Sequence, residues 1–190
     1  HRLRAVIPTI EWLTSRGAKV ICSSHLGNLK DHPRELPSLQ PVAKRLGELM
    51  GKEIPFAPAC HGTKPVQAMA KDLAPGEMMV LENTLFHLGE TKNDKRLAES
   101  MAGLADLVVN DDFSTSHRAL ASNEGICAIL NPCVSGFLFK TELDYLQGAI
   151  EDQPDAKLAA IVGGAKLSEK IPFMEGMIDK MSKIILTGGV

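Results

Sequence analysis

The sequence predicts an α/β protein with a doubly wound parallel sheet, followed by the start of a second α/β domain. Two observations lead to this fold class. Short apolar segments rich in Val, Ile, Leu and Met alternate with amphipathic segments, as buried parallel strands alternate with the helices that connect them. The chain of 190 residues is 44% hydrophobic and 23% charged, which is close to the average of globular proteins.

The apolar segments are expected to be strands because they are short and continuous, as strands buried on both faces are. They are Ala18–Ser23, Ile54–Phe56, Met78–Leu81, Leu107–Val109, Leu158–Val162 and Lys183–Leu186. The helices expected between them are Ala5–Arg16, Leu39–Met50, Thr63–Leu73, Lys92–Ala102, Phe137–Ile150 and Leu167–Met181. Gly17 and Gly51 directly follow the first two helices, at a position where glycine commonly ends a helix.

A polar, proline-containing segment over residues 151–155 follows the longest expected helix, and such a break indicates a domain boundary. We therefore place a domain boundary near residue 154. The chain has no initiator Met and ends directly after a predicted strand and two glycines. We interpret it as part of a longer protein.

The formal net charge of −2 gives no indication of nucleic acid or an anionic membrane as a partner. Cys22, Cys60, Cys127 and Cys133 form no C-x-x-C pair and have no metal-site spacing. We therefore expect reduced thiols in a cytoplasmic protein. No apolar run approaches the length of a membrane span, and no signal peptide is visible.

A glycine–lysine motif follows the fifth expected strand. The apolar run stops at Gly163-Gly164, and Lys166 and Lys170 follow four residues apart. Glycine lets a ligand approach the backbone, and a helix beginning near Ser168 would direct free N–H groups to the same place. The motif suggests a phosphate site whose spacing differs from that of the P-loop. A glycine turn followed by a solvated helix face is an equally weighted alternative.

Polar loops follow three other expected strands, at the edge where doubly wound proteins bind ligands. The first contains His25, for which a turn histidine without a ligand is the better-supported interpretation. The loop Asn110–Arg118 is dense in hydrogen-bonding groups, and its His-Arg pair can bind a carboxylate or phosphate; the alternative is a solvated loop. Glu82–His87 offers a carboxylate, an amide and an imidazole, and is weak evidence alone.

Several motifs occur together over almost the whole chain. They are Arg2-Leu3-Arg4-Ala5 with Pro8-Thr9-Ile10, Ser24-His25-Leu26-Gly27, Pro41-Val42-Ala43-Lys44-Arg45-Leu46, Leu81-Glu82-Asn83, Lys92-Asn93-Asp94, Val109-Asn110-Asp111, His117-Arg118-Ala119 and Gly163-Gly164-Ala165-Lys166. In this order and spacing they resemble phosphoglycerate kinase. The resemblance implies a monomeric two-domain hinge kinase of glycolysis, which transfers a phosphoryl group from 1,3-bisphosphoglycerate to ADP, giving 3-phosphoglycerate and ATP. It also implies a 3-phosphoglycerate-binding domain over residues 1–136 that lacks its first strand, an interdomain helix and hinge over 137–154, and the start of a nucleotide-binding domain over 155–190.

The resemblance also implies a role for each matching position. Catalytic positions are Arg2 and Lys166. Substrate-binding positions are His25, Leu26, Gly27, Asn28, His117 and Arg118. Nucleotide-binding positions are Gly163, Gly164, Ala165, Lys166, Lys170, Gly188 and Gly189. Mg²⁺ is expected to bind with ADP or ATP through ligands outside this chain. Phosphoryl transfer suits such a set, because it depends on positioning and positive charge.

The chain departs from the family pattern at several of these places. Asn28 and Leu85 stand where the family usually has arginines of the substrate patch. Further departures are Asp112, Ser114, Ser116, Leu120 and Pro172. Three interpretations therefore remain open: part of an active phosphoglycerate kinase, a divergent relative that serves as a weakly active, binding or structural protein, and an unrelated α/β oxidoreductase. The last is weak because no G-x-G-x-x-G follows a strand.

Overall fold

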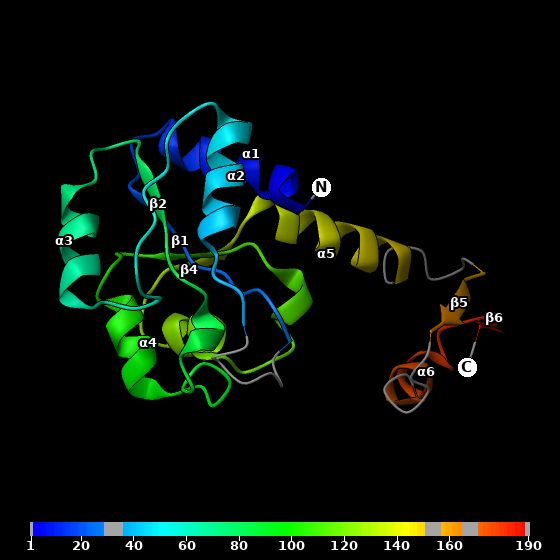
Figure 1. Ribbon diagram of the computed structural model, residues 1–190. Coiled ribbons are helices and arrows are strands. Elements are labelled where there is room, and N and C mark those ends of the chain that lie inside the picture. Colours follow the sequence, from blue (N-terminus) through cyan, green and yellow to red (C-terminus); the bar gives the residue numbers. More distant parts are fainter. Residues whose placement is uncertain (1, 29–35, 151–156, 165–170, 189–190) are drawn as a thin grey trace. The chain divides into compact units, whose positions relative to one another are not determined.

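The computed structural model describes residues 2–28, 36–150, 157–164 and 171–188 (Figure 1). The chain divides into two compact units, His1–Lys140 and Thr141–Val190. In chain order the elements are α1 (Arg2–Thr14), β1 (Val20–Cys22), α2 (Gln40–Met50), α3 (Lys64–Asp72), β2 (Met78–Val80), the 3₁₀ helix η2 (Thr84–Phe86), α4 (Lys95–Ala102), β3 (Val108–Asn110), the 3₁₀ helix η3 (Phe113–Thr115), the π-helix η4 (Ala121–Gly125), β4 (Cys133–Ser135), α5 (Phe137–Ile150), β5 (Ala159–Gly163), α6 (Ile171–Met177) and β6 (Lys183–Thr187).

Strand pairing is parallel wherever strands are described, which confirms the predicted α/β class. β1 pairs with β2, β3 with β4, and β5 with β6, in three two-stranded sheets within the described residues. A single parallel bridge from Phe56 to Val80 extends the first sheet. Each pair is separated in sequence by a helix or by helical turns, as parallel strands require.

The predicted strands agree with the structure except at two places. Ile54–Phe56 forms only the bridge at Phe56 rather than a strand. β4 was not predicted, because its three residues are all exposed and carry no apolar run. Among the helices, α5 has the predicted bounds, and α1 begins at Arg2 with Pro8 inside it. Part of the last predicted helix lies outside the described residues.

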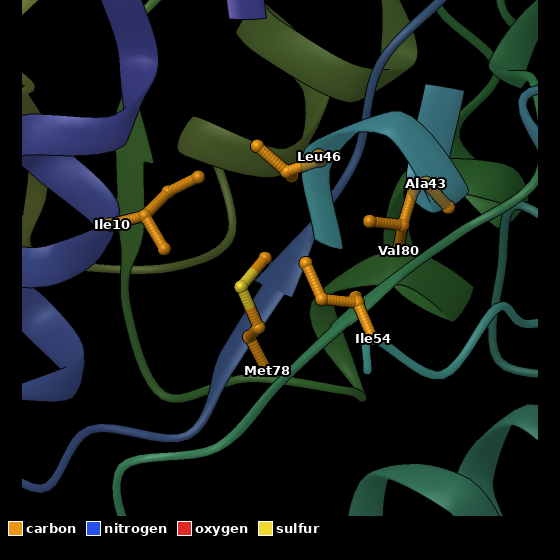
Figure 2. Packing of buried hydrophobic residues seen from close by; sticks show 6 residues of the cluster. All are labelled: Ile10, Ala43, Leu46, Ile54, Met78 and Val80. Carbon is orange, nitrogen blue, oxygen red and sulfur yellow. The ribbon is translucent and has the colours of Figure 1, made fainter. Parts of the chain in front are cut away.

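β2 is buried on both faces, which explains its continuous apolar sequence. Met78 and Val80 belong to a cluster with residues of α1 and α2 (Figure 2). Met79 and Leu81 belong to a second cluster that includes Val66 of α3. Because successive side chains of a strand point to opposite faces, helices cover both sides of this strand. This is the doubly wound arrangement expected from the sequence.

A third cluster joins α4 to the helical segment that contains η4. It is made of Leu97, Ala98, Met101, Ala102, Ala121 and Ile126. Val108 of β3 and Cys127 pack against it. Cys127 is bonded to Cys133 in a disulfide with Cα atoms 5.5 Å apart, so the expectation of four reduced thiols is wrong for this pair. The two cysteines are six residues apart in sequence, and the turn between them brings their Cα atoms within disulfide range.

The second unit has a different surface. β5 and β6 pair over five residues, but most of their side chains are exposed, including Ile161 and Leu186. Within the described part of the chain, no helix is both long enough and apolar enough to span a membrane.

Candidate functional site

The loop after β1 is fastened to the residues after β2 by one buried side chain, Asn83. Its amide nitrogen donates to the carbonyls of Leu26 (2.7 Å) and Pro37 (2.9 Å), and its amide oxygen accepts from the backbone N–H groups of Leu26 (3.3 Å) and Leu85 (3.1 Å). All the hydrogen-bonding capacity of this amide is used within the protein. Asn83 therefore positions the candidate ligand loop and leaves no group for a ligand.

Glu82 holds the far side of the same loop. Its carboxylate accepts hydrogen bonds from the Ser38 hydroxyl (2.7 Å) and the Leu39 N–H (2.9 Å), directly before α2. The carboxylate and amide noted in the sequence after β2 are thus positioning groups. Residues 29–35, in the middle of this loop, lie outside the described residues.

Gly27 has to be glycine in this loop. Its φ is 115°, and a Cβ atom here would lie 2.3 Å from the Leu36 side chain. Glycine alone tolerates both the backbone conformation and the contact. His25 is half-buried, whereas Leu26 and Asn28 are exposed. Among these four predicted substrate residues, Asn83 binds the backbone of Leu26, and His25 and Gly27 are its direct neighbours in the chain.

The loop after β3 is organised by Asp112. Its carboxylate accepts from the Ser114 N–H (3.0 Å), the Ser114 hydroxyl (2.5 Å) and the Thr115 hydroxyl (2.6 Å), which begins η3. Burial alone would raise the pKa of Asp112, but these hydrogen bonds and the charge of His25 hold it below its usual value. Because the charge of His25 contributes to this lowering, His25 lies within electrostatic range of the loop after β3.

The other predicted substrate residues lie at the surface. His117 and Arg118 are exposed, and the Arg118 Nε atom donates to His117 Nε2 at 3.2 Å. Arg2 is exposed at the start of α1. Leu85 is 5% exposed. This chain therefore has a core side chain at a position where the family usually has an arginine.

Sequence reasoning missed the residues that anchor the start of α5. The Phe137 N–H donates to the Thr9 hydroxyl (3.1 Å), and the Phe139 N–H donates to Asp111 Oδ1 (3.0 Å). A carboxylate at this helix end also interacts favourably with the helix dipole. A Cβ atom on Gly136 would lie 2.3 Å from the Asp111 carboxyl group. The Asn-Asp pair at the end of β3 is visible in the sequence, but the partner of Asp111 is 28 residues away.

In the second unit, the glycines predicted to bind nucleotide lie together. Gly163 is paired with Thr187 at the carboxyl ends of β5 and β6, and a Cβ atom on Gly163 would lie 2.6 Å from the Thr187 hydroxyl. Gly164 (φ 136°) and Gly188 (φ 72°) have conformations that favour glycine. The remaining predicted nucleotide residues, Ala165, Lys166, Lys170 and Gly189, lie outside the described residues.

No metal site accompanies these loops in the part of the chain that the structure describes. Over residues 2–28, 36–150, 157–164 and 171–188, no group of three His, Cys, Asp or Glu side chains could hold a metal ion. Asp112 is engaged by hydroxyl and amide donors, and Asp111 by the start of α5.

These features define an α/β protein in which loops at the carboxyl ends of parallel strands form candidate ligand sites. The phosphoglycerate kinase family model matches residues 1–190. The chain belongs to the phosphoglycerate kinase family.

Similarity to individual proteins agrees with this assignment. The chain is 47% identical over 189 residues to the phosphoglycerate kinase of Parasynechococcus marenigrum (strain WH8102), covering 100% of this chain and 46% of the relative. The chloroplastic phosphoglycerate kinase of Volvox carteri is also 47% identical, with coverage of 100% and 40%. The structure of phosphoglycerate kinase from Coxiella burnetii has 34% identity and a TM-score of 0.80, over 99% of this chain and 46% of that one. The chain thus spans about half the length of these relatives.

Proposed function

We propose that this chain forms the 3-phosphoglycerate-binding part, and the beginning of the nucleotide-binding part, of a phosphoglycerate kinase. The whole enzyme would transfer a phosphoryl group reversibly between 1,3-bisphosphoglycerate and ADP. Family membership supports the reaction class. The observation that carries the substrate site is that His25 lies within electrostatic range of the loop after β3, because both loops contain predicted ligands.

Each loop would contribute a different kind of contact. His25 and Arg118 would bind the phosphate and carboxylate of 3-phosphoglycerate through charge-assisted hydrogen bonds, with His117 beside Arg118. The Leu26–Asn28 backbone would lie against the ligand, since Gly27 lacks a side chain. Arg2 would stabilise the transferring phosphoryl group, for which positive charge is the main requirement.

The second unit would receive the nucleotide. Gly164 and Gly188 have positive φ angles at the ends of β5 and β6, and without side chains they would let phosphate groups approach the backbone closely. Lys166 and Lys170 would add positive charge. Mg²⁺ would arrive with ADP or ATP as part of the substrate. A cytoplasmic location and a monomeric state remain predictions from sequence.

Calorimetric titration of the 190-residue chain with 3-phosphoglycerate tests the substrate site. Arg118→Ala and His25→Ala should each weaken binding roughly ten- to 150-fold, since each removes one ionic hydrogen bond worth about 1.5–3 kcal/mol. Arg45→Ala is the matched control, because it removes an exposed arginine of α2 paired with Glu48.

In a coupled assay the chain alone should show no turnover, because catalysis requires both substrates held in line. Robust turnover would contradict this.

A divergent, weakly binding relative is the second candidate function. Two observations favour it. Leu85 is a core residue where an arginine is usual, and Asp112 places a negative charge within electrostatic range of His25. If the unmodified chain binds no 3-phosphoglycerate and Asn28→Arg restores binding, this candidate replaces the first. Equal affinity in the two proteins would count against it.

A further inference from the structure

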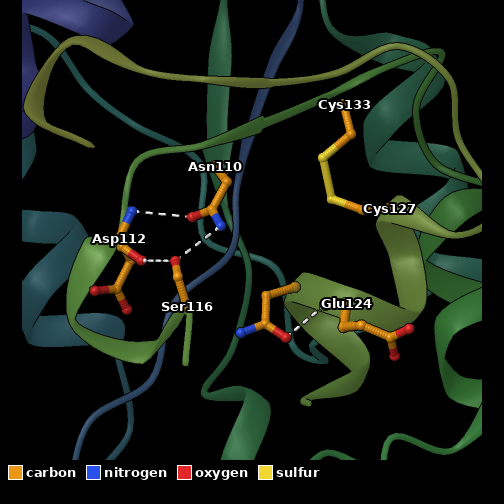
Figure 3. The surroundings of a disulfide bond; sticks show 7 residues. Asn110, Asp112, Ser116, Glu124, Cys127 and Cys133 are labelled. Atoms are coloured by element: carbon orange, nitrogen blue, oxygen red, sulfur yellow. Dashed lines mark hydrogen bonds between the residues drawn. A yellow bond between two sulfur atoms is a disulfide. The ribbon is translucent and has the colours of Figure 1, made fainter. Parts of the chain in front are cut away.

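The Cys127–Cys133 disulfide lies outside the substrate and nucleotide loops and has no part in the proposed reaction. It joins the helical turn after η4 to the first residue of β4 (Figure 3). Cys133 is exposed, whereas Cys127 is half-buried and packs against the hydrophobic cluster that joins α4 to the helical segment with η4. An attacking thiolate can therefore approach the bond from the Cys133 side.

The chain's two free cysteines, Cys22 and Cys60, are unsuited to the same chemistry. Burial raises the pKa of Cys22 to about 12. Burial, followed by the nearby charge of Glu90, raises the pKa of Cys60 to about 11. Because the thiolate is the reactive form, neither thiol competes for exchange near neutral pH. Thiol–disulfide chemistry in this chain is thereby confined to one pair.

The disulfide lies where it can stabilise both β4 and the start of α5. Cys133 is paired with Val108 at the start of the β3–β4 sheet, and the Val108 N–H donates to the carbonyl of Pro132 (3.2 Å). At the other end of the same sheet, the Gly136 N–H donates to the carbonyl of Asn110 (2.8 Å), just before α5 begins. The disulfide thus closes the loop that leads into β4, and β4 leads into α5.

We propose that Cys127–Cys133 is a thiol–disulfide exchange site that reacts with a dithiol reductant, and that its reduction loosens β4 and the start of α5. One thiolate of the dithiol attacks Cys133 Sγ. The bond between the two protein sulfurs breaks, and Cys127 leaves as a thiolate that takes up a proton. The second thiol of the reductant then displaces Cys133, so the reductant is oxidised to a disulfide while the protein gains two electrons and two protons.

Alkylation under native conditions tests the exchange itself. The oxidised 190-residue chain is incubated with or without dithiothreitol, treated with iodoacetamide and mapped by peptide mass spectrometry. We expect label on Cys127 and Cys133 only after dithiothreitol, with Cys22 and Cys60 unlabelled in both samples. Label on the pair before reduction, or a pair that opens only in denaturant, would overturn the proposal. So would equal labelling of all four cysteines.

The effect on the fold is tested by urea unfolding and amide hydrogen exchange. Closing a loop of this length is expected to favour folding by roughly fifty-fold on the chain-entropy model. Both the dithiothreitol-reduced chain and Cys133→Ser should lose this factor, and Cys133→Ser should no longer respond to dithiothreitol. Since Cys133 is exposed, this variant leaves the core intact.

Amide hydrogen exchange should accelerate at residues 133–139 when the disulfide is reduced. It should stay unchanged in β1 and β2, which lie in another sheet. Unfolding curves and exchange rates that are identical in the oxidised and reduced chains would overturn the predicted loosening.

Discussion

β2 in the first unit and β5 in the second are both parallel strands with apolar sequences, yet their surroundings are opposite. Met78, Met79 and Val80 of β2 are 3%, 0% and 3% exposed, whereas Ile161 of β5 is 73% exposed. The strand sequences alone do not account for this difference. In the first unit, helices α1, α2 and α3 supply side chains that cover both faces of β2. An apolar run therefore predicts a strand, but the elements that cover it decide how much it stabilises the fold.

The sharpest test of this comparison replaces one side chain in each strand. Met79→Ala should lower the free energy of unfolding by about 2–5 kcal/mol, because it removes a fully buried side chain and leaves a cavity. Ile161→Ala should change it by less than about 0.5 kcal/mol, because that side chain is mostly in solvent already. Urea unfolding of both variants provides the measurement. Similar losses in the two variants would show that β5 is as well covered as β2.

A second comparison concerns how the two units shape their ligand loops. The loop after β1 is held by the side chain of Asn83, whereas the loops after β5 and β6 depend on glycines. Asn83→Ala should cost about 1–3 kcal/mol, since it leaves buried backbone groups without partners. Thermal unfolding measures this loss, and Gln67→Ala, which removes an exposed amide bonded to one carbonyl, is the control. An Asn83→Ala protein as stable as the control would mean that water replaces the lost bonds.

The smallest expected effect is a pH dependence of the free energy of unfolding. We expect it in the first unit, because that unit contains all six histidines. Burial, and then the neighbouring His87, lower the pKa of His61. As pH falls through about 6.5, the unfolded chain binds a proton that the folded chain does not, so stability decreases. His61→Gln should reduce this decrease in urea unfolding between about pH 7.5 and about pH 5.5. The exposed His117→Gln serves as the control, and an unchanged slope in His61→Gln would rule out His61 as the cause.

Local sequence patterns were sufficient for part of the fold. α5 was predicted with its observed bounds because a long amphipathic segment ends in a polar run, and β2 because its buried faces require an unbroken apolar sequence. β4 could not be predicted in this way, since its three exposed residues have no pattern and form a strand only by pairing with β3. The same holds for the disulfide, because cysteine spacing gives no information on the path of the turn between Cys127 and Cys133.

The candidate site was predictable as a set of loops but not in its internal roles. The order of strands and polar segments was sufficient to locate His25 and the loop after β3 at strand ends. The functions of Glu82 and Asn83 depend on partners 43 to 57 residues away, and that of Asp111 on a partner 28 residues away. Hydrogen bonds between residues so distant in sequence leave no periodic signal.

The hydrogen bonds at the start of α5 determine the direction in which the whole helix points. Thr9 and Asp111 bind its first turn to α1 and to the residue after β3, and the helix is 14 residues long. At 1.5 Å per residue the helix is ~21 Å long, so a tilt of ~5° at its first turn displaces its far end by ~2 Å. A small change of angle at two hydrogen bonds therefore becomes an atomic-scale displacement of the last turn of the helix.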